Sequence, residues 1–301
     1  MSVRLLFLFL FLGTLYHLDA QQQPMYTQYM FNGLAINPAY AGSHESISAT
    51  ALARIQWVGI EGAPRTQTFS IHSPIPDRNI GLGAFFAHDE LGVTDQSTLY
   101  LSYAYMMQTG KGTLSMGIQG GFQSTNINYA ELGVNDNKLQ ASASEIAPNF
   151  GAGLFYSSSR FYVGASIPVL LNKELDGINN SDIKTSQIRH LFLTAGYVMD
   201  LSPVLKLKPS GLIKSVSGAP IEMDINANLI INDRVWLGAS YRSFDSISLL
   251  FDLQINPQLR FGYSYDYTTT DLGQANSGSH EFMLNYRFVF SKSKIVTPRY
   301  F

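Results

Sequence analysis

The strongest constraint on the fold is an alternation of apolar and polar residues with a period of two. Between Ile221 and Leu229 every odd-numbered residue is apolar, while the even-numbered residues are carboxylates and asparagines. A β-strand sends alternate side chains to opposite faces, whereas a helix would scatter both sets around its circumference. The alternation recurs along the chain, for example in 235–242 and 259–267. The pattern predicts an all-β protein whose strands each have one apolar and one polar face.

The spacing of the alternating segments predicts a transmembrane barrel. Most segments lie near the 9–11 residues that a tilted strand needs to cross a bilayer. Connections after even-numbered strands are short, and most of those after odd-numbered strands are longer, including 89–95, 125–145 and 169–187. Short turns at one end and longer loops at the other are typical of outer-membrane barrels, whereas a soluble sandwich has no reason for this parity. We expect a closed antiparallel β-barrel with both termini in the periplasm. Its fourteen predicted strands are 46–57, 66–73, 79–88, 96–107, 112–124, 146–157, 160–168, 188–199, 204–214, 221–231, 234–242, 246–254, 258–267 and 280–290.

The first residues predict export. Arg4 precedes the apolar run 5–12, which is too short to span a bilayer as a helix and is typical of a secretory signal peptide. Cleavage after Ala20 gives the expected organisation: signal peptide 1–20, N-terminal periplasmic segment 21–45, barrel 46–290 and periplasmic tail 291–301.

Composition excludes several classes of function. The chain has no Cys, so disulfides, thiolate metal sites and a Cys nucleophile are excluded. Its net charge is −2 and it has no basic patch, which argues against a nucleic-acid partner.

The two faces of the strands are assigned by solvent. Lipid offers no hydrogen bonds, so the apolar face should contact the outer-membrane lipid and the polar face should line the lumen. Lys206, Lys208 and Lys214 then lie on the strand beside Glu222 and Asp224. Opposite charges on neighbouring strands pair when buried. We therefore expect a lumen that is plugged rather than open.

Residues 21–45 precede the first strand and lack its alternation. They include Tyr26, Tyr29 and Met30, which are unsuited to a solvated tail, and Asn37-Pro38 is a turn signal. We expect a short helix and turn in the periplasmic mouth of the barrel. An ordered strap along the rim is the alternative.

Two groups of polar residues could carry chemistry. His88-Asp89-Glu90 could ligate a metal, but three adjacent side chains rarely converge on one ion, so a solvated loop is preferred. His280-Glu281 beside Ser277 and Ser279 suggests a hydrolase, yet no oxyanion-hole pattern accompanies it.

Glycine pairs in the chain do not predict a phosphate-binding loop. Gly81-x-Gly83 and Gly151-x-Gly153 lie inside predicted strands, where glycine relieves curvature or makes room for a plug. We expect no enzyme activity, no catalytic residue, no cofactor and no metal.

Several motifs resemble one family. The opening stretch of the mature chain, PMYTQYMFNGLAINPAYAGS at 24–43, is long and specific, and the other matching stretches are short. They are Arg54-Ile-Gln-Trp57, Gly62-Ala-Pro-Arg-Thr-Gln-Thr-Phe69, Asp89-Glu90-Leu91-Gly92, Arg189-His190, Leu207-Lys-Pro-Ser210, Asp266-Tyr267 and Thr297-Pro-Arg-Tyr-Phe301. Together they resemble the PorP/SprF family of Bacteroidetes outer-membrane proteins, over nearly the whole mature chain.

The resemblance implies a role in the type IX secretion system and gliding motility. It implies as partners a secreted adhesin with a C-terminal sorting domain, periplasmic secretion-system proteins, or both. The expected function is non-enzymatic support of adhesin secretion or anchoring, or coupling to periplasmic machinery. The alternative is a transporter of hydrophobic small molecules, because fatty-acid channels also have fourteen strands, an N-terminal hatch and an Asn-Pro-Ala element like Asn37-Pro38-Ala39.

The N-terminal segment is the predicted partner-binding site. Aromatic and Met side chains are enriched at interface cores, and we expect those of this segment to be exposed to a partner. The residues predicted to bind it are Tyr26, Tyr29, Asn37, Pro38, Tyr40 and Gly42.

Overall fold

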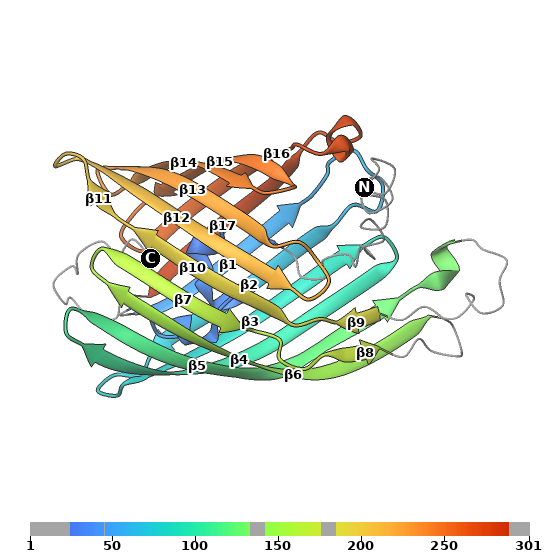
Figure 1. Ribbon diagram of the computed structural model, residues 1–301, viewed down its shortest axis with the longest axis horizontal. Coiled ribbons are helices and arrows are strands. Elements are labelled where there is room, and N and C mark those ends of the chain that lie inside the picture. Colours follow the sequence, from blue (N-terminus) through green and yellow to red (C-terminus); the bar gives the residue numbers. More distant parts are fainter. Residues whose placement is uncertain (1–24, 45, 133–141, 176–184, 289–301) are drawn as a thin grey trace, which may run out of the picture.

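The strands close into one antiparallel ring (Figure 1). The computed structural model describes residues 25–44, 46–132, 142–175 and 185–288, so the predicted signal peptide and C-terminal tail lie outside the described residues. The ring is formed by β1 (Ile47–Ile55), β2 (Arg65–Pro74), β3 (Ile80–Leu91), β4 (Thr94–Thr109), β5 (Gly112–Ile127), β6 (Ala143–Ser158), β7 (Phe161–Ile167), β10 (His190–Tyr197), β11 (Met199–Asp200), β12 (Leu205–Val216), β13 (Glu222–Ile231), β14 (Val235–Arg242), β15 (Ser246–Gln254), β16 (Leu259–Thr268) and β17 (Ser279–Phe288).

Two pairings complete the barrel. β1 pairs with β17, and β10 pairs with β12. β10 and β11 both pair with β12 and are interrupted only at Val198, so they act as one strand of a fourteen-stranded barrel. The predicted strand number and order are confirmed, with ends shifted by a few residues.

The predicted loop at 89–95 is wrong. β3 and β4 continue as a paired hairpin to Leu91 and Thr94, so the connection is only Gly92-Val93. Gly92 has a φ of 57°, which glycine adopts without strain. His88, Asp89 and Glu90 are all polar and hide the alternation, although the backbone stays extended there.

The predicted facing is confirmed by exposure. Ile225 is 60% exposed and Leu249 64%, whereas Asn226 is 1% exposed on the opposite face of β13. Without the alternation, a closed barrel could not present apolar groups to lipid and polar groups to its interior.

Short elements lie in the connections. β8 (Lys173–Leu175) and β9 (Thr185–Gln187) form a hairpin between β7 and β10 that the sequence did not predict. Two 3-10 turns, η4 (Tyr129–Leu132) and η6 (Asp271–Gln274), lie in other loops at the same end. We call this the loop end, and the end with the short connections the turn end. Among the described residues, no helix is long and apolar enough to cross a membrane.

Residues 25–44, which we call the lumenal segment, fill the inside of the barrel. They form the 3-10 turns η1 (Tyr29–Phe31), η2 (Gly33–Ala35) and η3 (Pro38–Tyr40), and most of their side chains are buried. We expected this segment at the periplasmic mouth; instead it extends along the lumen. Its first residues contact Arg54 near the loop end, and Gly42 contacts His72 near the turn end. Lumenal side chains such as Glu281 and Ser166 satisfy its backbone groups along the way.

Candidate functional site

At the loop end, the lumenal segment is held by a buried ionic cluster. Arg54 of β1 lies 2.7 Å from Asp266 of β16 and 3.1 Å from Glu281 of β17. The backbone amides of Thr27 and Gln28 donate to the two oxygens of Glu281, at 3.0 and 2.7 Å. All three charged side chains are almost fully buried, so removing one would leave an uncompensated charge. The cluster joins the lumenal segment to both strands that close the ring.

In the middle of the lumen, amides and hydroxyls hold the segment. Ser70 donates to the side-chain oxygen Oδ1 of Asn32 at 2.7 Å, and Asn226 donates to the Tyr29 hydroxyl at 2.7 Å. Ser166 donates to the backbone oxygen of Ile36 at 2.6 Å. These contacts reach β2, β13 and β7, so the segment is fixed to different sides of the barrel.

The predicted Asn37-Pro38 turn is confirmed, and its Asn37 side chain contacts the barrel wall at β6. The Asn37 side-chain oxygen accepts from the Ala39 amide at 2.9 Å, and its amide group donates to the backbone oxygen of Leu154 at 2.9 Å. A Cβ on Gly153 of β6 would lie 2.2 Å from the Asn37 oxygen. The strand glycine therefore makes the room that this turn needs.

The same relation holds at two further glycines. A Cβ on Gly117 of β5 would lie 2.2 Å from the Ala39 nitrogen, and one on Gly81 of β3 would lie 2.1 Å from the Ala41 oxygen. The prediction that strand glycines make room for a plug is confirmed at Gly81 and Gly153, and Gly117 is a further case that was not predicted.

Near the turn end, Phe31 packs in a cluster of cations and an indole. Its ring lies 5.2 Å from that of Trp236, edge to face, and 4.9 Å from the Arg260 guanidinium. Lys208 lies 5.2 Å from the Trp236 ring. A cation above the face of an aromatic ring is attracted by the ring, and the attraction is stronger where water is excluded.

The predicted charge pairs are correct in kind and different in detail. Lys206 binds Asp233 at 2.5 Å, in the turn rather than on the next strand. Asp224 receives the Arg242 guanidinium at 3.0 Å, a partner that the sequence reasoning missed. Lys214 and Glu222 face each other in the β12–β13 register. Arg242 could have been found, because it lies on the polar face of its strand.

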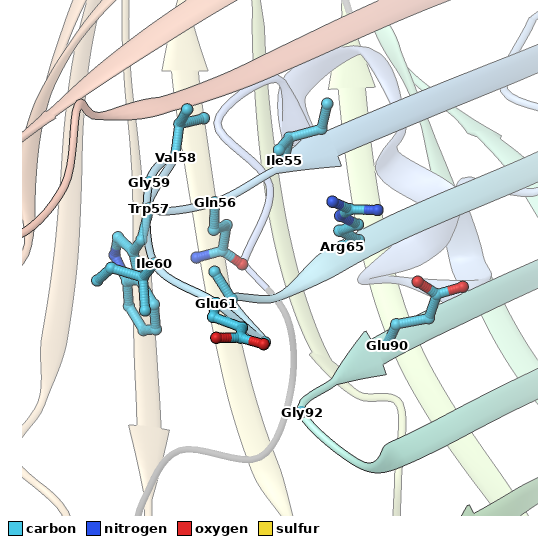
Figure 2. A pocket seen from close by; sticks show the side chains of 12 residues that line it. Ile55, Gln56, Trp57, Val58, Gly59, Ile60, Glu61, Arg65, Glu90 and Gly92 are labelled. Atoms are coloured by element: carbon cyan, nitrogen blue, oxygen red, sulfur yellow. The ribbon is translucent and has the colours of Figure 1, made fainter. Parts of the chain in front are cut away.

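A cavity of about 380 Å³ lies beside the β1–β2 connection at the loop end. Figure 2 shows Trp57 and Ile60 on one side of it, with Arg65 and Glu90 on the other. Trp57 has a φ of 46°, which is unusual for a bulky residue. Hydrogen bonds between Val58 and the β16–β17 loop hold the connection in place. We call this cavity the rim pocket.

All six predicted partner-binding residues lie in the lumenal segment and are buried. Tyr26 is 6% exposed, Tyr29 2% and Tyr40 5%, so the expectation of exposed side chains is wrong. The three rings are buried in apolar clusters with inward-facing wall residues. Tyr26 and Tyr29 lie in one cluster with Leu52, and Tyr40 lies in another with Phe155. Asn37, Pro38 and Gly42 line the path of the segment and are buried as well. Sequence reasoning missed Thr27, Asn32 and Gln28, whose polar groups anchor the segment.

The short motifs converge in space. Arg54–Trp57, Gly62–Phe69 and Asp89–Gly92 come from separate parts of the chain and meet at the rim pocket or just below it. Asp266 joins them through Arg54.

Comparisons place this arrangement among known proteins. The family model described as type IX secretion system membrane protein PorP/SprF matches residues 18–286. The outer membrane protein Omp33 of Acinetobacter baumannii is 8% identical, with a TM-score of 0.50, over 81% of this chain and 98% of its own. A FadL homologue of Pseudomonas aeruginosa is 12% identical, with a TM-score of 0.47, over 89% of this chain and 95% of its own. At 8% identity, the likeness to Omp33 shows the fold alone. A search of curated proteins found no match.

Proposed function

Because this chain belongs to the PorP/SprF family of type IX secretion system membrane proteins, we propose that it is a non-enzymatic component of that system. It resides in the outer membrane as an integral barrel. Its proposed role is to support secretion or surface anchoring of a partner adhesin, or to couple the barrel to periplasmic machinery.

The observation that carries this proposal is the filled lumen. The lumenal segment bonds to Glu281 near one mouth and to His72 near the other. A solute could pass only if this segment moved. A barrel whose interior is occupied by its own chain is better suited to holding a partner than to transport, which gives the fatty-acid-channel alternative less support.

We further propose that the lumenal segment couples the barrel to its partner. Its buried Tyr26 and Tyr40 can contact another protein only after the segment leaves the lumen. Alanine at these positions would remove core packing and confuse folding with recruitment. The segment must therefore be tested by restraining it rather than by truncating its side chains.

A designed disulfide provides that restraint. The Asn32 and Ser70 side chains are hydrogen-bonded at 2.7 Å, and the chain has no Cys, so Asn32→Cys with Ser70→Cys places the only two thiols of the chain at contacting positions for a crosslink. The oxidising periplasm favours its formation. If the segment must move to recruit a partner, oxidised cells will lose adhesin secretion or attachment, and a reductant will restore it.

Each single Cys variant is the matched control, since it changes one side chain without the crosslink. A locked barrel that secretes and anchors normally would show that the segment is only a structural filling. Deletion of the whole gene tests the broader proposal separately, because normal adhesin secretion without the protein would overturn the role itself.

A further inference from the structure

The β3–β4 hairpin brings together one imidazole and two carboxylates from two strands. His88 and Glu90 are two residues apart on β3 and share a face, whereas Asp89 lies between them and accepts a hydrogen bond from Thr66. Asp95 of β4 is the cross-strand partner of Glu90. The potential ligand atoms of His88, Glu90 and Asp95 all lie within 4.8 Å of one another, and His88 Nε2 is 3.4 Å from the Glu90 carboxylate.

A second contact orients the imidazole toward the carboxylates. His88 Nδ1 is 3.0 Å from the Ser97 hydroxyl, which leaves Nε2 directed at Glu90. Metal-binding histidines are commonly held this way by a hydrogen bond to the other ring nitrogen. The arrangement thus has an outer partner as well as potential ligands.

Space for further ligands lies next to the cluster. Glu90 also lines the rim pocket, with Arg65 on the neighbouring strand (Figure 2). A site with three protein ligands and access to solvent can complete its coordination with water.

We propose that His88, Glu90 and Asp95 bind one divalent transition-metal ion of the Zn²⁺ type. One imidazole and two carboxylates form a donor set suited to Zn²⁺ and less suited to Ca²⁺, which takes oxygen ligands. Ligand atoms of a Zn²⁺ site lie about 2.0–2.2 Å from the ion, so the Asp95 carboxylate would move toward the ion on binding. Its exposed side chain is free to do so. Adjacent residues alone would not converge; the cross-strand Asp95 supplies the third ligand.

Calorimetric titration of the detergent-purified full chain, without a polyhistidine tag, tests the site with Zn²⁺ as the probe. We expect one ion per chain. His88→Ala and Asp95→Asn should each weaken Zn²⁺ binding at least tenfold, and Ser97→Ala should weaken it by about tenfold through the imidazole. Asp89→Asn is the matched control, since that carboxylate lies on the same hairpin and accepts a hydrogen bond from Thr66. This variant should bind Zn²⁺ as tightly as the native chain.

Heat-modifiable gel mobility establishes that each variant is folded. Absence of Zn²⁺ binding by the native chain, or equal binding by folded His88→Ala and native chains, would overturn the site. Displacement of Zn²⁺ by an equal concentration of Ca²⁺ would also overturn it, because an imidazole-containing site should discriminate against Ca²⁺.

Discussion

Individual glycines determine whether the lumenal segment fits inside the barrel. Gly117 faces the lumen and allows Ala39 to approach the wall, whereas Gly211 faces outward and a Cβ there would have only one neighbour, at 3.3 Å. Both glycines lie inside barrel strands and differ in the face they occupy, so the same substitution can be compared at the two sites.

We predict that Gly117→Ala destabilises the barrel much more than Gly211→Ala does, because the contact at Gly211 is 1.1 Å longer (3.3 − 2.2 Å). The new methyl group would overlap Ala39, and overpacking of this kind costs about 1–3 kcal/mol. Urea unfolding followed by tryptophan fluorescence measures the free energy of unfolding of both variants. Equal stability would mean that Ala39 does not pack against Gly117.

The ionic cluster around Arg54 leads to a second prediction. Arg54→Ala leaves Asp266 and Glu281 facing each other while buried, and breaking a buried pair in this way costs about 3–5 kcal/mol. Arg65→Ala, on the exposed face at the same height, should cost less than about 1 kcal/mol. The same unfolding measurement compares them, and similar losses would contradict the assigned burial of Arg54.

Residue-level partners could be predicted only in part. The polar face of β13 placed Glu222 and Asp224 in the lumen correctly, and Asn37-Pro38 gave its turn. Thr27 was missed because its partners depend on ring closure and on where the lumenal segment lies, which no local pattern encodes. Arg242 could have been found, because it faces Asp224 across the β13–β14 hairpin.

At the scale of single elements, the outward faces of the strands carry the membrane contact. Leu249 of β15 is 64% exposed on the apolar face, while Ser264 of β16 is fully buried on the lumenal face. The alternation in 259–267 predicted the lumenal orientation of Ser264. It did not predict that the lumenal side lacks room for a large side chain, because alternation reports direction and not packing.

We predict that Leu249→Arg impairs folding in the bilayer. A lipid-facing arginine costs about 2–4 kcal/mol near the bilayer midplane, whereas Leu249→Met preserves both volume and polarity and should fold normally. Folding into liposomes, followed by heat-modifiable gel mobility, distinguishes them. Normal folding of the Arg variant would show that β15 does not face lipid at this position.

At the scale of the whole molecule, the direction of the chain through the barrel is the main departure from expectation. The segment leaves its contacts with Arg54 near the loop end, runs to Gly42 near the turn end and then reverses into β1. Barrel closure and strand order followed from the sequence, because each strand has a local pattern. The course of the lumenal segment did not, because it lacks any period and its position depends on partners from many strands.

This course predicts which side of the membrane the start of the segment faces. Tyr26 and Thr27 lie beside residues near the loop ends of β1, β16 and β17, and in outer-membrane barrels the long loops are external. An epitope inserted between Pro24 and Met25 should therefore bind antibody on intact cells. The same epitope inserted after Ser202, in the short connection between β11 and β12, should bind only after the outer membrane is permeabilised. Labelling of the Pro24–Met25 epitope only in permeabilised cells would mean that the segment enters from the periplasmic mouth, in which case its contacts with Arg54 and Glu281 could not be those described.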